Sequence, residues 1–272
     1  MNKDEIRNKI QNNFLKNLIF RIDFSGMMDA DVETFIQKIR PQLLKRDYVT
    51  LREEYGNNIN FNVLAPDNIQ TNTETTKTYV FNSKQGKELK ISKSFVIFEI
   101  NMERNETLFS NYIPLISIIL DELKNLQYVQ FNRIGLRKVN VCLLLNKKYL
   151  NDYFKQNVLC RFNDNSPTTQ VADEFFLQQY RVNYNRRFQE GKFLDDGKEK
   201  VGYQIILDID SYMQGVEVVD KKIKEENSNL ILAKLNDIIF NIYIDSLTTS
   251  FIENLEKDKY IDANIRGVIK NG

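Results

Sequence analysis

Apolar positions near the start of the chain follow first a helical and then a strand spacing. Ile6, Ile10 and Phe14 recur at intervals of four residues, which places them on one face of a short amphipathic helix. From residue 17 onward apolar and polar positions alternate as far as Gly26, and this alternation predicts a half-buried strand that ends at the glycine.

Strand patterning dominates residues 48–102. Within this stretch Pro66–Thr76 is polar and aperiodic, which predicts a loop, and residues 83–87 are typical of a hairpin turn. Residues 32–39 before the stretch and 108–126 after it have the periodicity of amphipathic helices. The predicted strands are residues 48–51, 59–63, 78–81, 89–91 and 93–100.

The second half of the chain repeats this order of elements. Arg133-Ile134 corresponds there to Arg21-Ile22 in the first half, which hints at a duplication. The predicted elements are a strand over residues 131–145, a short helix over 148–154, strands over 175–184 and 203–209, and one long helix from about 219 to 251.

These elements divide the chain into four parts. They are an N-terminal amphipathic helix (1–16), a first α+β half (17–128), a second α+β half (129–252) and a C-terminal tail (253–272). The predicted fold class is α+β, with antiparallel sheets covered by helices and two tandem β-α-β(n)-α halves.

Composition excludes several kinds of chemistry. The 272 residues include 38 Lys and Arg against 37 Asp and Glu, for a formal net charge of +1. This balance demands neither a nucleic acid nor an acidic membrane as partner. The chain contains no histidine, which excludes Ser-His-Asp catalysis, Cys-His catalysis and zinc sites that need histidine. It also contains no P-loop, and we predict no cofactor.

Two features of the sequence indicate a cytoplasmic protein with no membrane partner. The N-terminus runs straight into charged residues, so no signal peptide is expected. The longest apolar stretch, Tyr112 to Leu120, is about half of what a membrane span needs. The cysteines Cys142 and Cys160 lie in apolar surroundings and are expected to be buried free thiols.

The segment Arg133-Ile-Gly-Leu-Arg137 is the first candidate site. On a strand, Arg133, Gly135 and Arg137 share one face, and two guanidinium groups side by side can hold a phosphate or a carboxylate. The alternative is that both arginines form ion pairs with acids on a neighbouring strand. Asn140, further along the segment, either orients a ligand or satisfies backbone groups.

Asp208 and Asp210 form a second constellation, because alternation puts both carboxylates on one strand face. Such a pair can share Mg²⁺ in phosphotransfer. A working site usually needs a third acid and a phosphate cradle, so we predict no metal site and keep metal-dependent phosphotransfer as a minor alternative. The other interpretation is that these acids neutralise Arg133 and Arg137.

Residues 178–188 interleave basic and aromatic side chains, a pattern that suits single-stranded nucleic acid. Acidic residues follow closely, at positions 190, 195, 196 and 199, so the positive field is local. The alternative is a solvated strand end. The candidate nucleic-acid contacts are Tyr180, Arg181, Tyr184, Arg186 and Arg187.

The segment Arg133-Ile-Gly-Leu-Arg-Lys-Val-Asn140 also carries a family resemblance. Together with Ile19-Phe-Arg-Ile-Asp-Phe24 and Leu207-Asp-Ile-Asp210, it resembles a sporadically distributed family of uncharacterised prokaryotic proteins of similar length, whose central strand reads R-[IV]-G-L-R-[YF]-x-N. Order and spacing match over most of residues 17–250; Lys138 stands where an aromatic residue is more usual, and the N-terminal helix is extra. The resemblance implies accessory genes, such as phage-defence or host–virus conflict loci.

The leading hypothesis is therefore a non-catalytic cytosolic binding or adaptor protein that recognises a protein partner. The alternative is a nucleic-acid or nucleotide binder that uses the Arg133/Arg137 face and the Tyr180–Phe188 segment. The sequence leaves homo-oligomerisation open.

Overall fold

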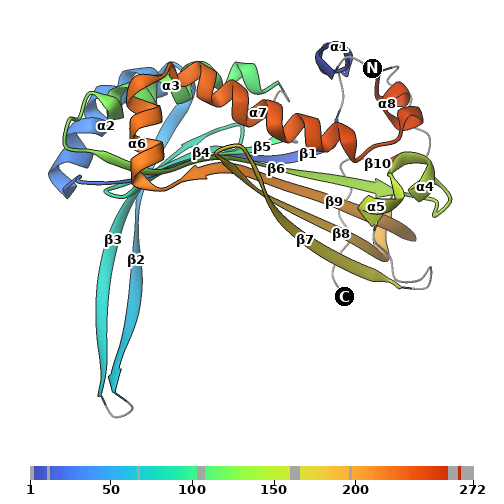
Figure 1. Ribbon diagram of the computed structural model, residues 1–272, viewed down its shortest axis with the longest axis horizontal. Coiled ribbons are helices and arrows are strands. Elements are labelled where there is room, and N and C mark those ends of the chain that lie inside the picture. Colours follow the sequence, from blue (N-terminus) through green and yellow to red (C-terminus); the bar gives the residue numbers. More distant parts are fainter. Residues whose placement is uncertain are drawn as a thin grey trace.

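The strands of the protein form one antiparallel sheet, and its helices cover a single face of that sheet (Figure 1). The computed structural model describes residues 3–10, 13–65, 68–102, 108–159, 166–195, 198–256 and 263–264. The predicted α+β class, with an antiparallel sheet covered by helices, is confirmed. The separate sheets expected for the two halves are joined into one.

The described strands run in the order β2-β3-β4-β5-β1-β6-β9-β8-β7, and β10 pairs with β6. They are β1 (Leu15–Ser25), β2 (Tyr48–Ala65), β3 (Asn68–Ser83), β4 (Lys87–Ser92), β5 (Phe95–Asn101), β6 (Gln130–Leu144), β7 (Thr168–Leu177), β8 (Tyr180–Asp195), β9 (Lys198–Gln214) and β10 (Ala263–Asn264). The helices are α1 (Lys3–Lys9), α2 (Asp29–Leu44), α3 (Ile113–Lys124), α4 (Tyr149–Tyr153), α5 (Gln156–Leu159), α6 (Val216–Glu225), α7 (Ser228–Asp245) and α8 (Thr249–Glu256), with a 3₁₀ turn η2 (Phe109–Asn111).

The two halves meet at the pairing of β1 with β6. Ile22 lies directly opposite Ile134, and both side chains are fully buried. These two isoleucines are also the equivalent residues of the proposed halves, so the pairing is centred on the same position of each half. Moving outward, β1 is followed by β5 and β4, and β6 by β9 and β8. This register supports a duplication, which stays a prediction.

Alternation along the strands directs the core to the helix side of the sheet. On β8 the side chains of Val182, Tyr184, Arg186 and Phe188 are buried, whereas those at positions 181, 183, 185 and 187 are half-exposed. Most buried residues of the strands and helices form one core cluster, and Leu143 and Phe193 form a small separate cluster. Burying a Val, Leu, Ile, Phe or Met side chain stabilises a fold by about 1.5–3 kcal/mol. The burial of many such side chains therefore holds the helices against this face of the sheet.

The predicted loop at Pro66–Thr76 is wrong for its described residues. Residues 68–76 belong to β3, which pairs with β2 along its length as a hairpin that projects away from the helices (Figure 1). Pro66 itself lies outside the described residues. The sequence of this segment shows no apolar alternation, so periodicity alone does not predict a strand here. Its threonines still favour extended backbone.

The predicted long helix over residues 219–251 is wrong as well, because it is three helices. α6 ends at Glu225 and α7 begins at Ser228, where the Asn227 side chain accepts a hydrogen bond from the backbone N–H of Asn229 at 2.8 Å. An asparagine cap of this kind starts a new helix. α8 then continues to Glu256, across the predicted boundary between residues 252 and 253.

Two smaller predictions differ from the structure. The predicted strand over residues 175–184 is split into β7 and β8 by a turn at Gln178, whose φ is 57°. The first helix ends at Lys9 and β1 already begins at Leu15, so the predicted helical segment reaches too far at its C-terminal end, although Ile6, Ile10 and Phe14 are all buried as expected.

Gly26 ends β1 in a conformation that demands glycine. Its φ is +100°, and a Cβ at this position would lie 2.2 Å from the carbonyl oxygen of Tyr128. We expect Gly26→Ala to lower the free energy of unfolding by about 1–3 kcal/mol, measured by urea denaturation. The matched control is Gly56→Ala, where a Cβ meets nothing within 4 Å; there the stability should stay level or rise slightly. Equal stability of the two variants would contradict the strain at Gly26.

Candidate binding face

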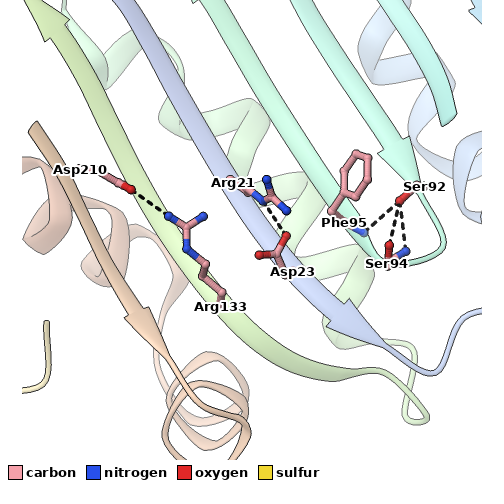
Figure 2. Close-up of polar contacts among 7 residues, drawn as sticks. All are labelled: Arg21, Asp23, Ser92, Ser94, Phe95, Arg133 and Asp210. Carbon is pink, nitrogen blue, oxygen red and sulfur yellow. Dashed lines mark hydrogen bonds and ion pairs between the residues drawn. The ribbon is translucent and has the colours of Figure 1, made fainter. Parts of the chain in front are cut away.

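The face of the sheet that points away from the helices is the candidate site, here called the open face. Figure 2 looks onto its centre, with the helices behind the strands. Alternation on four neighbouring strands brings its central side chains together. In cross-strand register, Ile97 of β5 lies beside Arg21 of β1, then Gly135 of β6 and Tyr212 of β9.

The arginines and aspartates of the two predicted constellations form ion pairs with each other. The Arg133 Nη2 atom lies 3.0 Å from Asp210 Oδ2 (Figure 2). Arg137 binds Asp208 through two hydrogen bonds, Nε to Oδ1 at 2.7 Å and Nη2 to Oδ2 at 2.6 Å. The interpretation that the acids neutralise the arginines is thereby confirmed.

A third ion pair lies beside these two on β1, where Arg21 Nε donates to Asp23 Oδ1 at 2.7 Å (Figure 2). Arg21 and Arg137 each keep close to half of their side-chain surface exposed, whereas Asp23 and Asp208 are mostly buried. The open face therefore presents guanidinium groups whose carboxylate partners lie beneath them.

The absence of a side chain at Gly135 leaves room for Tyr212 of β9, which lies opposite it. A Cβ at this position would lie 2.8 Å from the Cβ of Tyr212. The Tyr212 ring is nearly buried, and the Arg133 guanidinium lies 4.5 Å from its centroid, in a cation–π contact. The glycine between the two arginines thus makes room for a packed ring.

Burial and ion pairing set the protonation of this cluster. Burial raises the pKa of Asp210, while Arg133 and Arg137 pull it back down. The hydrogen bonds that Arg137 donates to Asp208 raise the pKa of Arg137. Both guanidinium groups are engaged by carboxylates, so an anion would have to compete with Asp208 and Asp210 for them.

The arrangement is poor for a metal ion. Asp208 and Asp210 direct their oxygens at guanidinium groups. Among the described residues no group of three or more His, Cys, Asp or Glu side chains is placed to hold a metal ion. Neither observation supports the minor alternative of metal-dependent phosphotransfer.

The candidate nucleic-acid residues do not share a face, which corrects that interpretation of residues 180–188. Tyr180 and Tyr184 point into the core and are nearly inaccessible. Arg186 is buried on the same side, where it donates to the carbonyl oxygen of Asn157 at 2.8 Å and pairs with Asp173. Base stacking needs exposed rings, so the tyrosines form no stacking platform. The remaining candidates, Arg181 and Arg187, lie on the open face, where Arg181 pairs with Glu174.

Asn140 lies on the helix side of β6 and is not part of the Arg133/Arg137 face. It is buried, and its Nδ2 donates to the carbonyl oxygen of Leu207 at 3.2 Å. Of the two roles left open by the sequence, the structure shows the one that satisfies a backbone group.

Lys138 is a residue of interest that the sequence reasoning noted only as a departure from the family pattern and did not choose as a candidate site residue. It lies on the helix side of β6, donates to Asn236 Oδ1 at 2.6 Å and sits 5.5 Å from the centroid of the Phe109 ring. Burial, followed by repulsion from Arg7, lowers its pKa to about 7, while Asp237 acts in the opposite direction. The signal was present in the sequence: alternation from Ile134 and Leu136 requires an inward side chain at position 138.

The low pKa of Lys138 predicts a specific pH dependence of stability. In the unfolded chain a lysine titrates near 10.4, so between pH 7 and that value the unfolded state binds more protons than the folded state. The free energy of unfolding must then rise with pH over this window. Relative to Lys138→Met, the wild type should gain up to about 1.4 kcal/mol per pH unit above pH 7 in urea unfolding. A stability difference that is independent of pH would contradict the assignment.

Two comparisons with known proteins found no relative of this chain. No protein-family model matches the chain, and a search of curated proteins finds no significant match. Among the described residues, no helix has both the length and the apolar character needed to cross a membrane.

Proposed function

We propose that the protein is a non-catalytic cytosolic binding or adaptor protein whose open face binds a protein partner. The observation that carries this proposal is the surface chemistry of that face. Ion pairs that are already formed alternate there with half-exposed apolar side chains, over strands from both halves of the sheet. The half-exposed apolar residues of the central strands are Ile19, Phe95, Ile97, Val139 and Ile206.

This mixture is typical of protein–protein interfaces. Such interfaces are enriched in arginine and aromatic residues and pair their charged groups at the contact. On the open face the arginines are already ordered by Asp23, Asp208 and Asp210. A partner would therefore immobilise few additional side chains, which lowers the entropic penalty of association.

The shape of the sheet favours a folded protein domain as the partner. The β2–β3 hairpin projects from one end of the sheet, on the side away from the helices, and β7, β8 and β9 slope the same way at the other end (Figure 1). The open face lies on the inner side of this curve. A rounded protein surface would contact its strands and both flanks at once.

Two observations favour a protein over a nucleic acid or nucleotide. Four arginines of the open face are balanced by acids in contact with them, in the pairs Arg21–Asp23, Arg133–Asp210, Arg137–Asp208 and Arg181–Glu174. A nucleic-acid site needs uncompensated positive charge along its length. Tyr180 and Tyr184, the rings that would have stacked with bases, are in the core. The accessory or phage-defence context implied by the family resemblance belongs to this proposal as its setting.

The test is affinity purification from the organism that encodes the protein, read out by native mass spectrometry. Wild type should retain a protein of defined stoichiometry, which includes a second copy of the chain as one outcome. Arg137→Glu and Ile97→Asp, both on the open face, should each weaken retention by about tenfold or more. The control is Lys224→Glu on α6, whose side chain pairs with Asp220 at 3.0 Å away from the open face, and this variant should behave as wild type.

Three results would overturn the proposal. One is retention of the partner that is equal in wild type and both open-face variants, with urea midpoints showing that all are folded. Another is a retained nucleic acid that is lost steeply as salt is raised, since that dependence reports phosphate contacts. The third is a partner lost equally from the Lys224→Glu control.

A further inference from the structure

A cavity of about 630 Å³ lies on the helix side of the sheet, opposite the open face. Its floor includes Leu15 of β1 with Lys138 and Asn140 of β6, and its walls come from α1, α7 and the η2 turn. Small-molecule sites in proteins commonly have volumes of about 300–1,000 Å³. The cavity is therefore large enough for a ligand of modest size.

The charges at this cavity leave one cation without an acid. Of the described residues that line it, three are charged: Arg7, Lys138 and Asp237. Arg7 and Asp237 satisfy each other, with Nη1 and Oδ1 2.6 Å apart. Lys138 donates to the neutral amide oxygen of Asn236 and forms no ion pair with any described residue. A lysine ammonium has three N–H donors, so two remain for a ligand.

The remaining walls are largely apolar. They include Ile10, Leu15, Phe109, Ile113, Ile239 and Phe240. Polar side chains at the cavity, such as Asn13 and Ser110, are neutral. An apolar cavity with a few convergent polar groups is the usual form of a site for an amphipathic small molecule.

We propose that this cavity binds a small amphipathic monocarboxylate, whose carboxylate contacts Lys138 and whose apolar part lies against the residues of α1, α7 and η2. Among the described residues at the cavity, Lys138 is the one cation that no carboxylate contacts, which matches a ligand with one negative charge. A phosphate monoester, with close to two charges, would require a second free cation, and Arg7 is held by Asp237. The site lies on the other face of the sheet from the proposed protein-binding surface, so each proposal can fail without the other.

Ligand binding should be coupled to protonation of Lys138. Its pKa is about 7 because burial and Arg7 disfavour the ammonium, while Asp237 opposes them only in part. A carboxylate beside it would raise that pKa. Above pH 7 binding must then take up as much as one proton, and the affinity should fall by up to about tenfold per pH unit. At about pH 6 or below Lys138 is already charged, and proton uptake should disappear.

The experiment is isothermal titration calorimetry of the full chain with octanoate, below the concentration at which octanoate forms micelles. Wild type should bind octanoate, and Lys138→Met should bind it about tenfold more weakly or worse, because a charge-assisted contact is lost. The matched control is Lys234→Met. Lys234 is an exposed lysine of α7, the helix that lines the cavity, but Lys234 itself does not line it. This variant should bind octanoate as wild type does.

Two further probes test the chemical class and the location. Octanol has the same chain without the charge, so it should bind weakly and equally to wild type and Lys138→Met. Ala233→Phe adds a ring to a residue that lines the cavity and should block octanoate without removing Lys138. Titrations at pH 8 in buffers of different ionisation enthalpy report the proton uptake directly.

The proposal is overturned if wild type does not bind octanoate at millimolar concentration. It is also overturned if Lys138→Met binds octanoate as tightly as wild type, or if no proton is taken up at pH 8. Tighter binding of octyl phosphate than of octanoate would replace the carboxylate by a phosphate as the ligand group.

Discussion

Both candidate sites of this protein depend on the register of β6 between β1 and β9. Successive side chains of a strand point to opposite faces, so a shift of one residue exchanges the two sides of the sheet. In the observed register, Ile134 pairs with Ile22 in the core while Arg133 and Arg137 meet the aspartates of β9. The same alternation places Lys138 among the helices. Hydrophobic burial of the isoleucines thus determines where both candidate sites lie.

The sequence predicted those parts of the structure that are governed by apolar periodicity. The central strands and the α+β class follow from it, because a sheet covered on one face must alternate. The ion pairing of Arg133 and Arg137 with Asp208 and Asp210 was also predictable as one of two alternatives, since opposite charges at strand spacing find each other across neighbouring strands. What the sequence did not specify was that the two halves share one sheet, because strand order depends on contacts between distant segments.

The errors have physical causes that are particular to each segment. The N-terminal part of β3 lacks apolar periodicity, so its pairing with β2 in a projecting hairpin was not predictable from that pattern. The break between α6 and α7 is marked by one capping hydrogen bond that the Asn227 side chain accepts, and the helical spacing of apolar residues on both sides of it gives no sign of the break. Lys138 was not chosen as a site residue because a lysine is expected in solvent, and only the cavity beneath α7 explains how it lies inside. A local sequence pattern predicts the environment that is most common for that pattern, whereas these three segments lie in less common environments.

The carboxylates that pair with Arg133 and Arg137 also determine how the open face acts at a distance. A guanidinium with a carboxylate 3.0 Å or less away is seen from afar as a dipole, whose field falls off faster than that of a net charge. Long-range attraction therefore contributes little to bringing a partner to this face, and encounter rates should be those of ordinary diffusion rather than electrostatic steering. Selection among partners then takes place only after contact, through the fit of one surface against another.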